Sequence, residues 1–333
     1  MTFSIIIPVC NVAPYLRECL DSVCVAVERV GNGERGTGNR CGVEIICVDD
    51  GSTDGSGEIL DEYREKVERK GDGGRWKVLH QTNQGVAIAR QVAMDHCTGE
   101  WICSVDPDDW VEPDFLKSFC DAIRDGPADM VWCDYYRDRG RSVRVSARTD
   151  ENATRHLEAI LQDRVRGSLW NRAFSKRFVD ANNVRFPPRG CNTAEDMAFL
   201  CDCLLHDPVI RWIPACNYHY VHRDGSMCNP RPNPEAYAPF VRSIEHIETL
   251  LARAGRKESL RFRKQQIKFG MYDKPWIPNE RFAATFPEVR DLRDLEVGVW
   301  HKWLFALAAR GRRSGVIWLL KVVRTVLGPF RCR

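Results

Sequence analysis

The feature that most constrains the fold is a regular alternation of two kinds of segment over the first 106 residues. Short runs rich in Ile and Val predict strands, and the stretches between them repeat apolar residues at the helical period. The expected strands are 3–9, 43–50, 76–81 and 100–106, and the expected helices between them are 13–30, 56–70 and 85–97. Strands that alternate with helices favour a parallel sheet covered on both faces. We therefore predict an α/β fold.

Polar clusters follow three of these expected strands. They are Asn11, the pair Asp49 and Asp50, and the run 106–109, which holds three aspartates. Ligands of such sheets bind outside the carboxyl ends of the strands, so we expect the clusters to line one crevice. Three carboxylates so close together raise one another's cost of ionising. Solvent, helix-start amides or a bound cation must offset that repulsion.

The length and composition indicate a globular protein with one large domain or two. The chain has 333 residues, of which 44% are hydrophobic. The N-terminus has no basic segment and no small-residue cleavage site, so we predict no signal peptide and a cytoplasmic location. The 15 cysteines are scattered and mostly have apolar neighbours, which is typical of reduced, buried thiols. Cys201 and Cys203 are two positions apart in a helical pattern and so point apart, which disfavours a zinc site.

One glycine-rich stretch imitates a nucleotide-binding motif. GNGERG at 31–36 has the Gly-x-Gly-x-x-Gly spacing of a dinucleotide loop. A phosphate-binding loop of that type follows a strand and begins a helix, whereas this stretch follows a helix and precedes a strand. We interpret 31–42 as a flexible surface loop.

Five motifs, in order, resemble those of glycosyltransferase family 2. They are SIIIPVCN, VDDGSTDGS, NQGVAIARQVA, SVDPDDWVEPDFL and AEDMAFL, and LWNRAFSKRF, NVRFP and YHYVHRDGSMCN add support. The resemblance implies a catalytic domain over 1–230 with the GT-A fold, a Rossmann-like and mainly parallel sheet flanked by helices. It also implies a nucleotide-diphosphate sugar as donor, most often a UDP-sugar, a divalent cation (Mn²⁺ or Mg²⁺) and inversion at the anomeric carbon. The acceptor would be a saccharide or a lipid-linked saccharide, by analogy in bacterial surface-polysaccharide synthesis.

The resemblance assigns the aspartate run to a metal site. By that resemblance Asp108 is a direct metal ligand, and Asp106 lies near the ribose or the metal. The chain shows no Walker-type lysine loop, so a cation is the obvious counter-charge for a diphosphate. The alternative is a solvated turn in which Asp108 or Asp109 caps the helix expected over 112–126. We favour the metal for Asp108 and leave both interpretations open for Asp109.

The resemblance also indicates where the nucleotide base binds. It places Asp50 against the base edge, with Pro8 and Asn11 in the same pocket and Arg90 near the base or behind the aspartates. The motif around Asp50 is equally compatible with an ordinary turn and a helix cap. Arg90 lies in a helical pattern, where an arginine often faces solvent.

Asp196 is the candidate general base, because it resembles the second member of the family's Glu-Asp pair. A sugar hydroxyl is a poor nucleophile until its proton is being removed. The spacing Thr193-x-x-Asp196 also resembles a capping box, and a helix start would keep the carboxylate ionised. The two interpretations are compatible. Glu195 has no assigned role, and His222 and Arg223 either reach the leaving diphosphate or lie on a mobile surface loop.

The C-terminal third resembles no segment of the family. Helices are expected over 235–255 and 258–274, within a helical region at 231–296. Residues 297–333 hold eight basic residues and no acidic one, whereas the other 41 basic and 46 acidic residues leave 1–296 with a net charge near −5.

The tail at 297–333 also carries Trp300, Trp303 and Trp318, and it has no run of ~18 uncharged apolar residues that could span a membrane. Tryptophan beside basic residues predicts an amphipathic, peripheral contact with an anionic inner leaflet. The alternative is a helix packed on the catalytic domain or on a homodimer partner.

Two other classes of function stay open. A nucleotidyltransferase also uses paired aspartates and a metal on an α/β sheet, but it typically has a Gly-rich, basic loop after the first strand, which PVCNVAPYL lacks. A catalytically silent nucleotide-binding or scaffold protein would keep the sheet without turnover. No nucleic-acid partner is expected. The sequence pattern does not specify the donor sugar, acceptor, linkage or oligomeric state.

Overall fold

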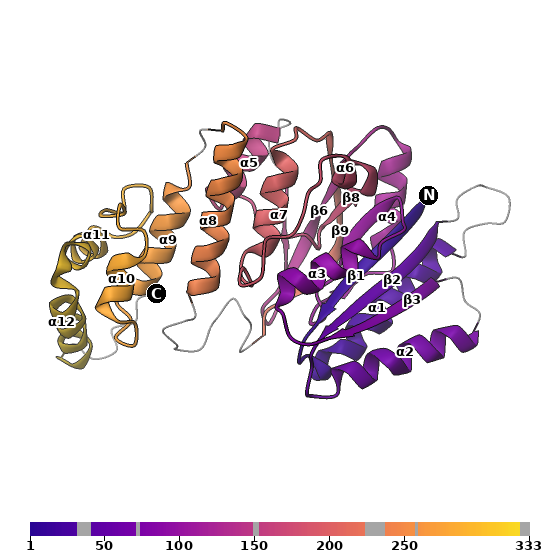
Figure 1. Ribbon diagram of the computed structural model, residues 1–333, viewed down its shortest axis with the longest axis horizontal. Helices are drawn as coiled ribbons and strands as arrows, with labels where there is room; N and C mark the ends of the chain where they lie inside the picture. The colour runs from indigo at the N-terminus through magenta and orange to yellow at the C-terminus, as the bar shows by residue number, and fades with distance from the viewer. Residues whose placement is uncertain (32–40, 71–73, 149–152, 224–236, 257–258, 327–333) are drawn as a thin grey trace. The chain divides into compact units, whose positions relative to one another are not determined.

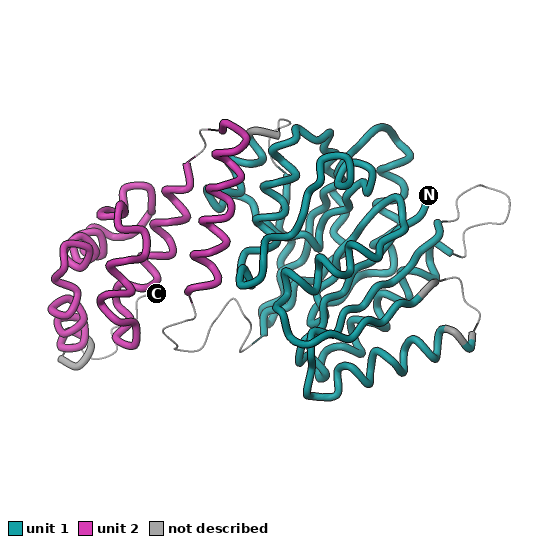
Figure 2. Tube along the Cα trace, viewed as in Figure 1, with its two compact units in different colours: residues 1–226 teal, residues 227–333 magenta. Residues whose placement is uncertain are grey.

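The computed structural model describes residues 1–31, 41–70, 74–148, 153–223, 237–256 and 259–326 (Figure 1). The chain divides into two compact units, residues 1–226 and residues 227–333 (Figure 2). Most of the loop predicted over 31–42 lies outside the described residues, as does the domain boundary predicted near residue 230.

The described residues of unit 1 are built on one nine-stranded sheet. The strand order is β3-β2-β1-β4-β8-β6-β9-β5, with β7 paired to β6. The strands are β1 (Thr2–Val9), β2 (Gly42–Asp50), β3 (Gly74–Gln81), β4 (Trp101–Ser104), β5 (Trp110–Val111), β6 (Met130–Asp138), β7 (Ser142–Val145), β8 (Arg172–Ser175) and β9 (Ile210–Val221). The four strands β3, β2, β1 and β4 are parallel, whereas β8 is antiparallel to both of its neighbours. The predicted mixed, mainly parallel α/β sheet is confirmed.

The helices of unit 1 cover both faces of this sheet (Figure 1). They are α1 (Ala13–Gly31), α2 (Ser56–Lys70), α3 (Val86–Asp95), α4 (Phe115–Arg124), α5 (Ala153–Leu161), α6 (Lys176–Ala181) and α7 (Glu195–Leu204). The order of strands turns back at β1, since β4 joins β1 on the side away from β2. Right-handed crossovers therefore send α3 to the face opposite α1 and α2. In α1 the predicted apolar stripe is buried at Leu16, Leu20 and Val23, and only half-buried at Val27.

The strand register explains why the polar clusters lie at one edge. Val9 at the end of β1 pairs with Asp49 of β2, and Ile6 pairs with Ser104 at the end of β4. Because these strands are parallel, Asn11, Asp50 and the run 106–109 all follow carboxyl ends at the same edge of the sheet. This edge includes the reversal of strand order between β1 and β4, where ligands of open α/β sheets bind.

Unit 2 is helical. Its elements are α8 (Ala238–Arg253), α9 (Arg261–Tyr272), α10 (Asn279–Ala284), α11 (Val299–Leu307), the π-helical turn η1 (Ala308–Arg312) and α12 (Arg313–Val326). The chain kinks within η1 at Gly311, whose φ of 87° is one that glycine adopts readily. Among the described residues, no helix is both long and apolar enough to cross a membrane.

Candidate active site

Arg90 joins the carboxyl end of β4 to the start of α7. Its guanidinium donates to an oxygen of Asp106 at 2.7 Å and to an oxygen of Glu195 at 2.6 Å. The side chain is buried, so the solvated-face interpretation of Arg90 is wrong. Burial alone would lower the pKa of Arg90, but the two carboxylates raise it. Arg90 is therefore a fixed positive charge that neutralises part of the acidic cluster.

Asp108 is the carboxylate of the run that lacks such support. It is half-buried, and among the described residues no other residue donates a hydrogen bond to its carboxylate. Burial raises the pKa of Asp108 to about 6, and the negative charge of Asp106 contributes to the rise. A carboxylate in this position gains from a bound cation, because a cation stabilises the ionised form.

Asp109 has a structural partner set of its own. One carboxylate oxygen accepts the Tyr218 hydroxyl at 2.7 Å, and the other accepts the Val221 N–H at 2.8 Å. Burial raises the pKa of Asp109 well above its usual value, and the charges of Asp106 and Asp108 raise it further. The predicted helix cap is wrong: α4 begins at Phe115, next to Asp114. Asp109 binds the distant strand β9 instead, because two donors are available there inside the fold.

Tyr218 is a site residue that the sequence interpretation missed. Its hydroxyl donates to Asp109 and also accepts the N–H of Asp106 at 3.1 Å. The ring is fully buried and stacks on Trp170 with centroids 4.4 Å apart. Tyr218 therefore fixes the backbone that presents Asp106 and Asp108. The only sequence signal was its place in the YHYVHRDGSMCN segment, which gives no indication of a hydroxyl partner.

The predicted base-binding residues are held at the ends of β1 and β2. Asp50 is buried and accepts three hydrogen bonds, from the Gln81 side chain at 2.7 Å and from the N–H groups of Gln84 and Gly85 at 2.8 Å each. These bonds tie the end of β2 to the start of α3, so Asp50 stabilises the loop whatever else it binds.

Asn11 adopts a left-handed backbone with φ of 53°. Its N–H donates to the Ser52 hydroxyl at 3.1 Å, and its side-chain oxygen accepts the Thr53 N–H at 2.8 Å. Pro8 is buried in β1 opposite Val48. The structure thus brings Asn11 against the loop that follows Asp50, and the contact of these residues with a base stays a prediction.

Asp196 and Glu195 occupy the first turn of α7, next to the Arg90 bridge. Burial raises the pKa of Asp196, while the positive charges of Arg90 and Arg166 oppose the rise. Burial also raises the pKa of Glu195 to about 7, against the pull of Arg90. The predicted capping box is wrong, since the residue before the helix is Ala194, with φ of 60° and no side-chain cap. The left-handed turn at Ala194 displaces Thr193 from the capping position.

Arg223 and His222 differ in their surroundings. Arg223 donates from Nε to the backbone oxygen of Asp108 at 2.9 Å, and its guanidinium lies 3.8 Å from the centre of the Tyr15 ring. His222 is exposed, and its N–H donates to the backbone oxygen of Asp138. Arg223 therefore belongs to the acidic run, whereas nothing in the geometry joins the His222 side chain to it.

The residues of the run fit a hard divalent cation. Asp106 and Asp108 supply carboxylate oxygens, which Mn²⁺ and Mg²⁺ prefer. A bound cation would also stabilise the ionised form of Asp108, whose pKa is raised. Within the described ranges, no group of three or more His, Cys, Asp or Glu side chains is arranged to hold a metal. A cation here would therefore need oxygens from its ligand or from water, as Mg²⁺ sites in phosphate-binding proteins commonly do.

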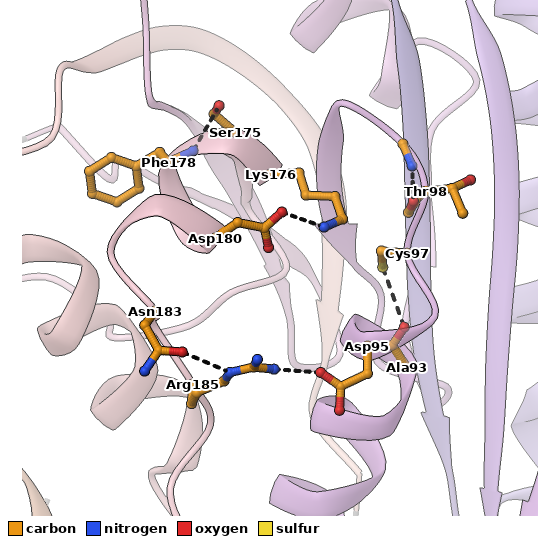
Figure 3. Close-up of polar contacts among 12 residues, drawn as sticks. Ala93, Asp95, Cys97, Thr98, Ser175, Lys176, Phe178, Asp180, Asn183 and Arg185 are labelled. Atoms are coloured by element: carbon orange, nitrogen blue, oxygen red, sulfur yellow. Dashed lines mark hydrogen bonds and ion pairs between the residues drawn. The ribbon is translucent and has the colours of Figure 1, made fainter.

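A separate polar hollow lies at the other end of β4. It is lined by Met94, Asp95, Lys176, Val179, Asp180, Asn183, Val184 and Arg185. Figure 3 shows that its two cations already face carboxylates: Lys176 pairs with Asp180, and Arg185 pairs with Asp95. Because these charges are matched, the hollow offers no free cation to an anionic ligand.

Comparisons with known proteins agree with this geometry. Residues 4–185 match the family model described as Glycosyl transferase family 2. EpsH of Bacillus subtilis (strain 168), a provisionally assigned glycosyltransferase, is 30% identical over 224 residues, which cover 65% of this chain and 60% of that protein. The poly(ribitol-phosphate) beta-glucosyltransferase of Bacillus spizizenii is 27% identical over 274 residues, covering 80% of this chain and 39% of that protein. The matched region thus spans 60% of the length of EpsH and 39% of the length of the second relative.

Among solved structures, residues 1–349 of S. aureus TarS resemble the whole chain. The TM-score is 0.58 at 20% identity, with 99% of this chain and 93% of that chain covered. The same TarS fragment has also been crystallised in complex with UDP-GlcNAc. At this level of identity the likeness bears on the fold, and it confirms the predicted GT-A architecture with helices at the C-terminal side.

Proposed function

The chain belongs to glycosyltransferase family 2, and on that basis we propose that it transfers a sugar from a nucleotide-diphosphate sugar to a saccharide or lipid-linked saccharide, with inversion. The observation that carries this proposal is the unsupported Asp108 carboxylate beside Asp106, at the carboxyl edge of the parallel strands. An anionic diphosphate can bind at an acidic edge only if cations intervene.

The donor would bind across the ends of β1, β2 and β4. Pro8, Asn11 and Asp50 are the proposed base-binding residues, and the UDP-GlcNAc complex of TarS supports a UDP-sugar. Asp106 and Asp108 would hold Mn²⁺ or Mg²⁺, which when bound supplies Lewis-acid stabilisation to the leaving diphosphate. Arg90 would hold Asp106 in position through its 2.7 Å ion pair. Arg223, against the backbone of Asp108, is placed to add positive charge on the same side.

The acceptor hydroxyl would lose its proton to Asp196. Inversion requires attack from the face opposite the leaving diphosphate, so the base must be a residue other than the carboxylates that hold the metal. Asp196 meets that requirement, because it lies on α7, whereas Asp106 and Asp108 follow β4. Arg90 and Arg166 favour the ionised form of Asp196 against the effect of burial. A positioned general base of this kind contributes roughly 10²- to 10⁴-fold to the rate.

A panel of UDP-, GDP- and dTDP-sugars with Mn²⁺ tests the proposal. We expect one donor class to release its nucleoside diphosphate, by slow hydrolysis alone and faster when an acceptor saccharide is added. Release of pyrophosphate from a nucleoside triphosphate would instead establish a nucleotidyltransferase. Nucleotide binding without any turnover, over a broad set of acceptors, would favour a silent binding protein.

We also propose a peripheral membrane contact for the helices α11 and α12, which suits a lipid-linked acceptor. Four large apolar side chains of this helix pair are strongly exposed, namely Val299, Trp300, Trp303 and Trp318. Exposed cations accompany them at Arg310, Arg312 and Lys321, and no residue from 297 onward is acidic. Tryptophan with basic neighbours suits the interface of an anionic bilayer.

A buried arginine holds the start of α12 against other residues of unit 2. Arg313, at the start of α12, donates to the backbone oxygens of Met271, Tyr272, Lys274 and Ile277 and to the side chain of Asn279. Deleting the whole segment would therefore also disturb the core of unit 2. The better test replaces Trp300 and Trp303 with Ser and measures sedimentation with vesicles containing phosphatidylglycerol. We expect the double variant to lose vesicle binding and the control Val209→Ser to keep it. If the wild-type protein does not bind vesicles but forms a dimer, the exposed face would instead be a contact with a second copy of the chain.

A further inference from the structure

Two buried thiols of unit 1 are in contact, away from the acidic edge. Cys41 directly precedes β2 and lies at the opposite end of that strand from Asp50, and Cys120 lies in α4. Their sulfur atoms are 2.8 Å apart, and both side chains are buried. That separation is about 0.75 Å more than the ~2.05 Å of a disulfide bond. No large movement of the backbone is therefore needed to join them.

The charges around the pair make the two sulfurs unequal. The hydrogen bond between the two thiols lowers the pKa of Cys41 against the effect of burial, and the guanidinium of Arg124, 3.5 Å from the Cys41 sulfur, lowers it further. The same contact and burial raise the pKa of Cys120. Other buried cysteines differ: burial raises the pKa of both Cys47 and Cys103. Cys41, which faces the Arg124 guanidinium, is thus the more acidic thiol of the pair.

We propose that Cys41 and Cys120 form a peroxide-sensitive modification site that closes to a disulfide. The Cys41 thiolate attacks one oxygen of hydrogen peroxide, the O–O bond breaks, and Cys41 becomes a sulfenic acid while the other oxygen leaves as hydroxide and takes up a proton to become water. The Cys120 sulfur then attacks the Cys41 sulfur, its proton leaves with the departing hydroxyl, and a second water is released. The two thiols lose two electrons in total, and the peroxide gains them.

The bond would stabilise unit 1 without entering the active site. It closes a ring from residue 41 to residue 120, which contains Asp50, Arg90 and Asp106. A cross-link over so long a loop restricts the unfolded chain strongly and favours the folded state. Cys41 lies at the amino end of β2, so the geometry of the carboxyl edge should not change.

Thiol counting and peptide mapping on the full chain test this inference. After brief hydrogen peroxide treatment and denaturation, we expect the free thiols to fall from 15 to 13 and to return with dithiothreitol. Trypsin should release peptide 41–64 linked to peptide 118–124. Because peptide 41–64 also holds Cys47, fragmentation must place the link at Cys41. The oxidised protein should melt at a higher temperature than the reduced one.

Matched variants separate the pair from the other cysteines. Cys41→Ala, which removes the attacking thiol, should keep all 14 of its remaining thiols under the same treatment, whereas Cys97→Ser, which changes an equally buried cysteine outside the pair, should still lose two. The proposal would be overturned if the wild type kept all its thiols. It would also be overturned if the link joined any pair of cysteines other than Cys41 and Cys120. None of these readouts depends on glycosyl transfer, so this inference and the proposed function can fail separately.

Discussion

Two carboxylates at opposite ends of the parallel strands, Glu44 and Asp108, have opposite surroundings. At the amino end, Glu44 of β2 accepts hydrogen bonds from the Ser4 hydroxyl at 2.6 Å, the Thr98 hydroxyl at 2.9 Å, the Gly99 N–H at 3.2 Å and the Lys77 ammonium at 3.1 Å. Burial alone would raise the pKa of Glu44, but these donors lower it to about 2. At the carboxyl end, no other residue that the structure describes donates a hydrogen bond to the Asp108 carboxylate, and burial raises its pKa to about 6.

The contrast separates a carboxylate that is stabilised within the fold from one that we propose binds a ligand. Hydrogen bonds to an ionised carboxylate stabilise it, so Glu44 contributes to the free energy of folding. A buried, unsupported carboxylate destabilises the free protein and is typical of functional sites. We therefore expect Glu44 to stabilise the fold, and we propose that Asp108 keeps its charge available for a cation and a diphosphate.

The largest expected effect comes from Asp108→Ala. We expect the rate of donor turnover to fall by roughly 10²-fold or more, since metal stabilisation of a leaving group contributes several kcal/mol. The melting temperature of the metal-free protein should stay unchanged or rise, because a repelling buried charge is removed. Steady-state kinetics measures the fall in turnover, and thermal denaturation measures the melting temperature. A marked loss of stability would mean that Asp108 is structural like Glu44.

Asp196→Asn sharpens the functional side of the comparison. We expect turnover to fall about 10²- to 10⁴-fold, as for loss of a general base, while donor affinity stays within a few-fold. Asp202→Asn on the same helix is the matched control, because it removes another half-buried carboxylate with a raised pKa. Full transfer by Asp196→Asn with bound donor would remove Asp196 from the mechanism.

Local sequence patterns predict much of the sheet and of its acidic edge, but they do not predict the contacts between residues that are distant in the sequence. The alternation of apolar runs predicts β1 to β4, and their polar ends predict the acidic edge, because both patterns are local. The partners of Asp109 and Arg90 are not local: Tyr218 is 109 positions from Asp109, and Glu195 is 105 positions from Arg90. Local rules left a cap open for Asp109 and a solvated face open for Arg90, and the tertiary hydrogen bonds of both residues exclude these alternatives.

Glu44→Gln tests the structural side. The substitution keeps the shape but removes the charge that four residues stabilise through hydrogen bonds, so we expect the free energy of unfolding to fall by about 3 kcal/mol at pH 7. Activity per folded molecule should be retained well below the melting temperature. Urea denaturation measures the change, and Glu100→Gln, an exposed carboxylate at the same edge, is the control. An unchanged unfolding midpoint for Glu44→Gln would contradict the assignment.

The smallest effect is a change in acid sensitivity. The pKa of Glu44 is lower in the folded protein, about 2, than its usual value of 4.5, so its contribution is complete above pH 4.5 and is lost as the pH falls towards 2. Between these values the wild type should lose stability more steeply with falling pH than Glu44→Gln does. Urea midpoints measured from pH 5 to pH 3 compare the slopes, and parallel slopes would show that Glu44 does not titrate abnormally.

The central claim is that Asp106 and Asp108 bind a dication together with the donor nucleotide. Isothermal titration of UDP, GDP and dTDP into the protein, first with Mn²⁺ and then with excess EDTA, tests it directly. We predict that the preferred nucleotide binds at least about 10-fold more tightly with Mn²⁺, and that Asp108→Ala abolishes the difference. Equal affinity with and without the metal, for every nucleotide that binds, would contradict the claim and leave the aspartate run as a structural turn.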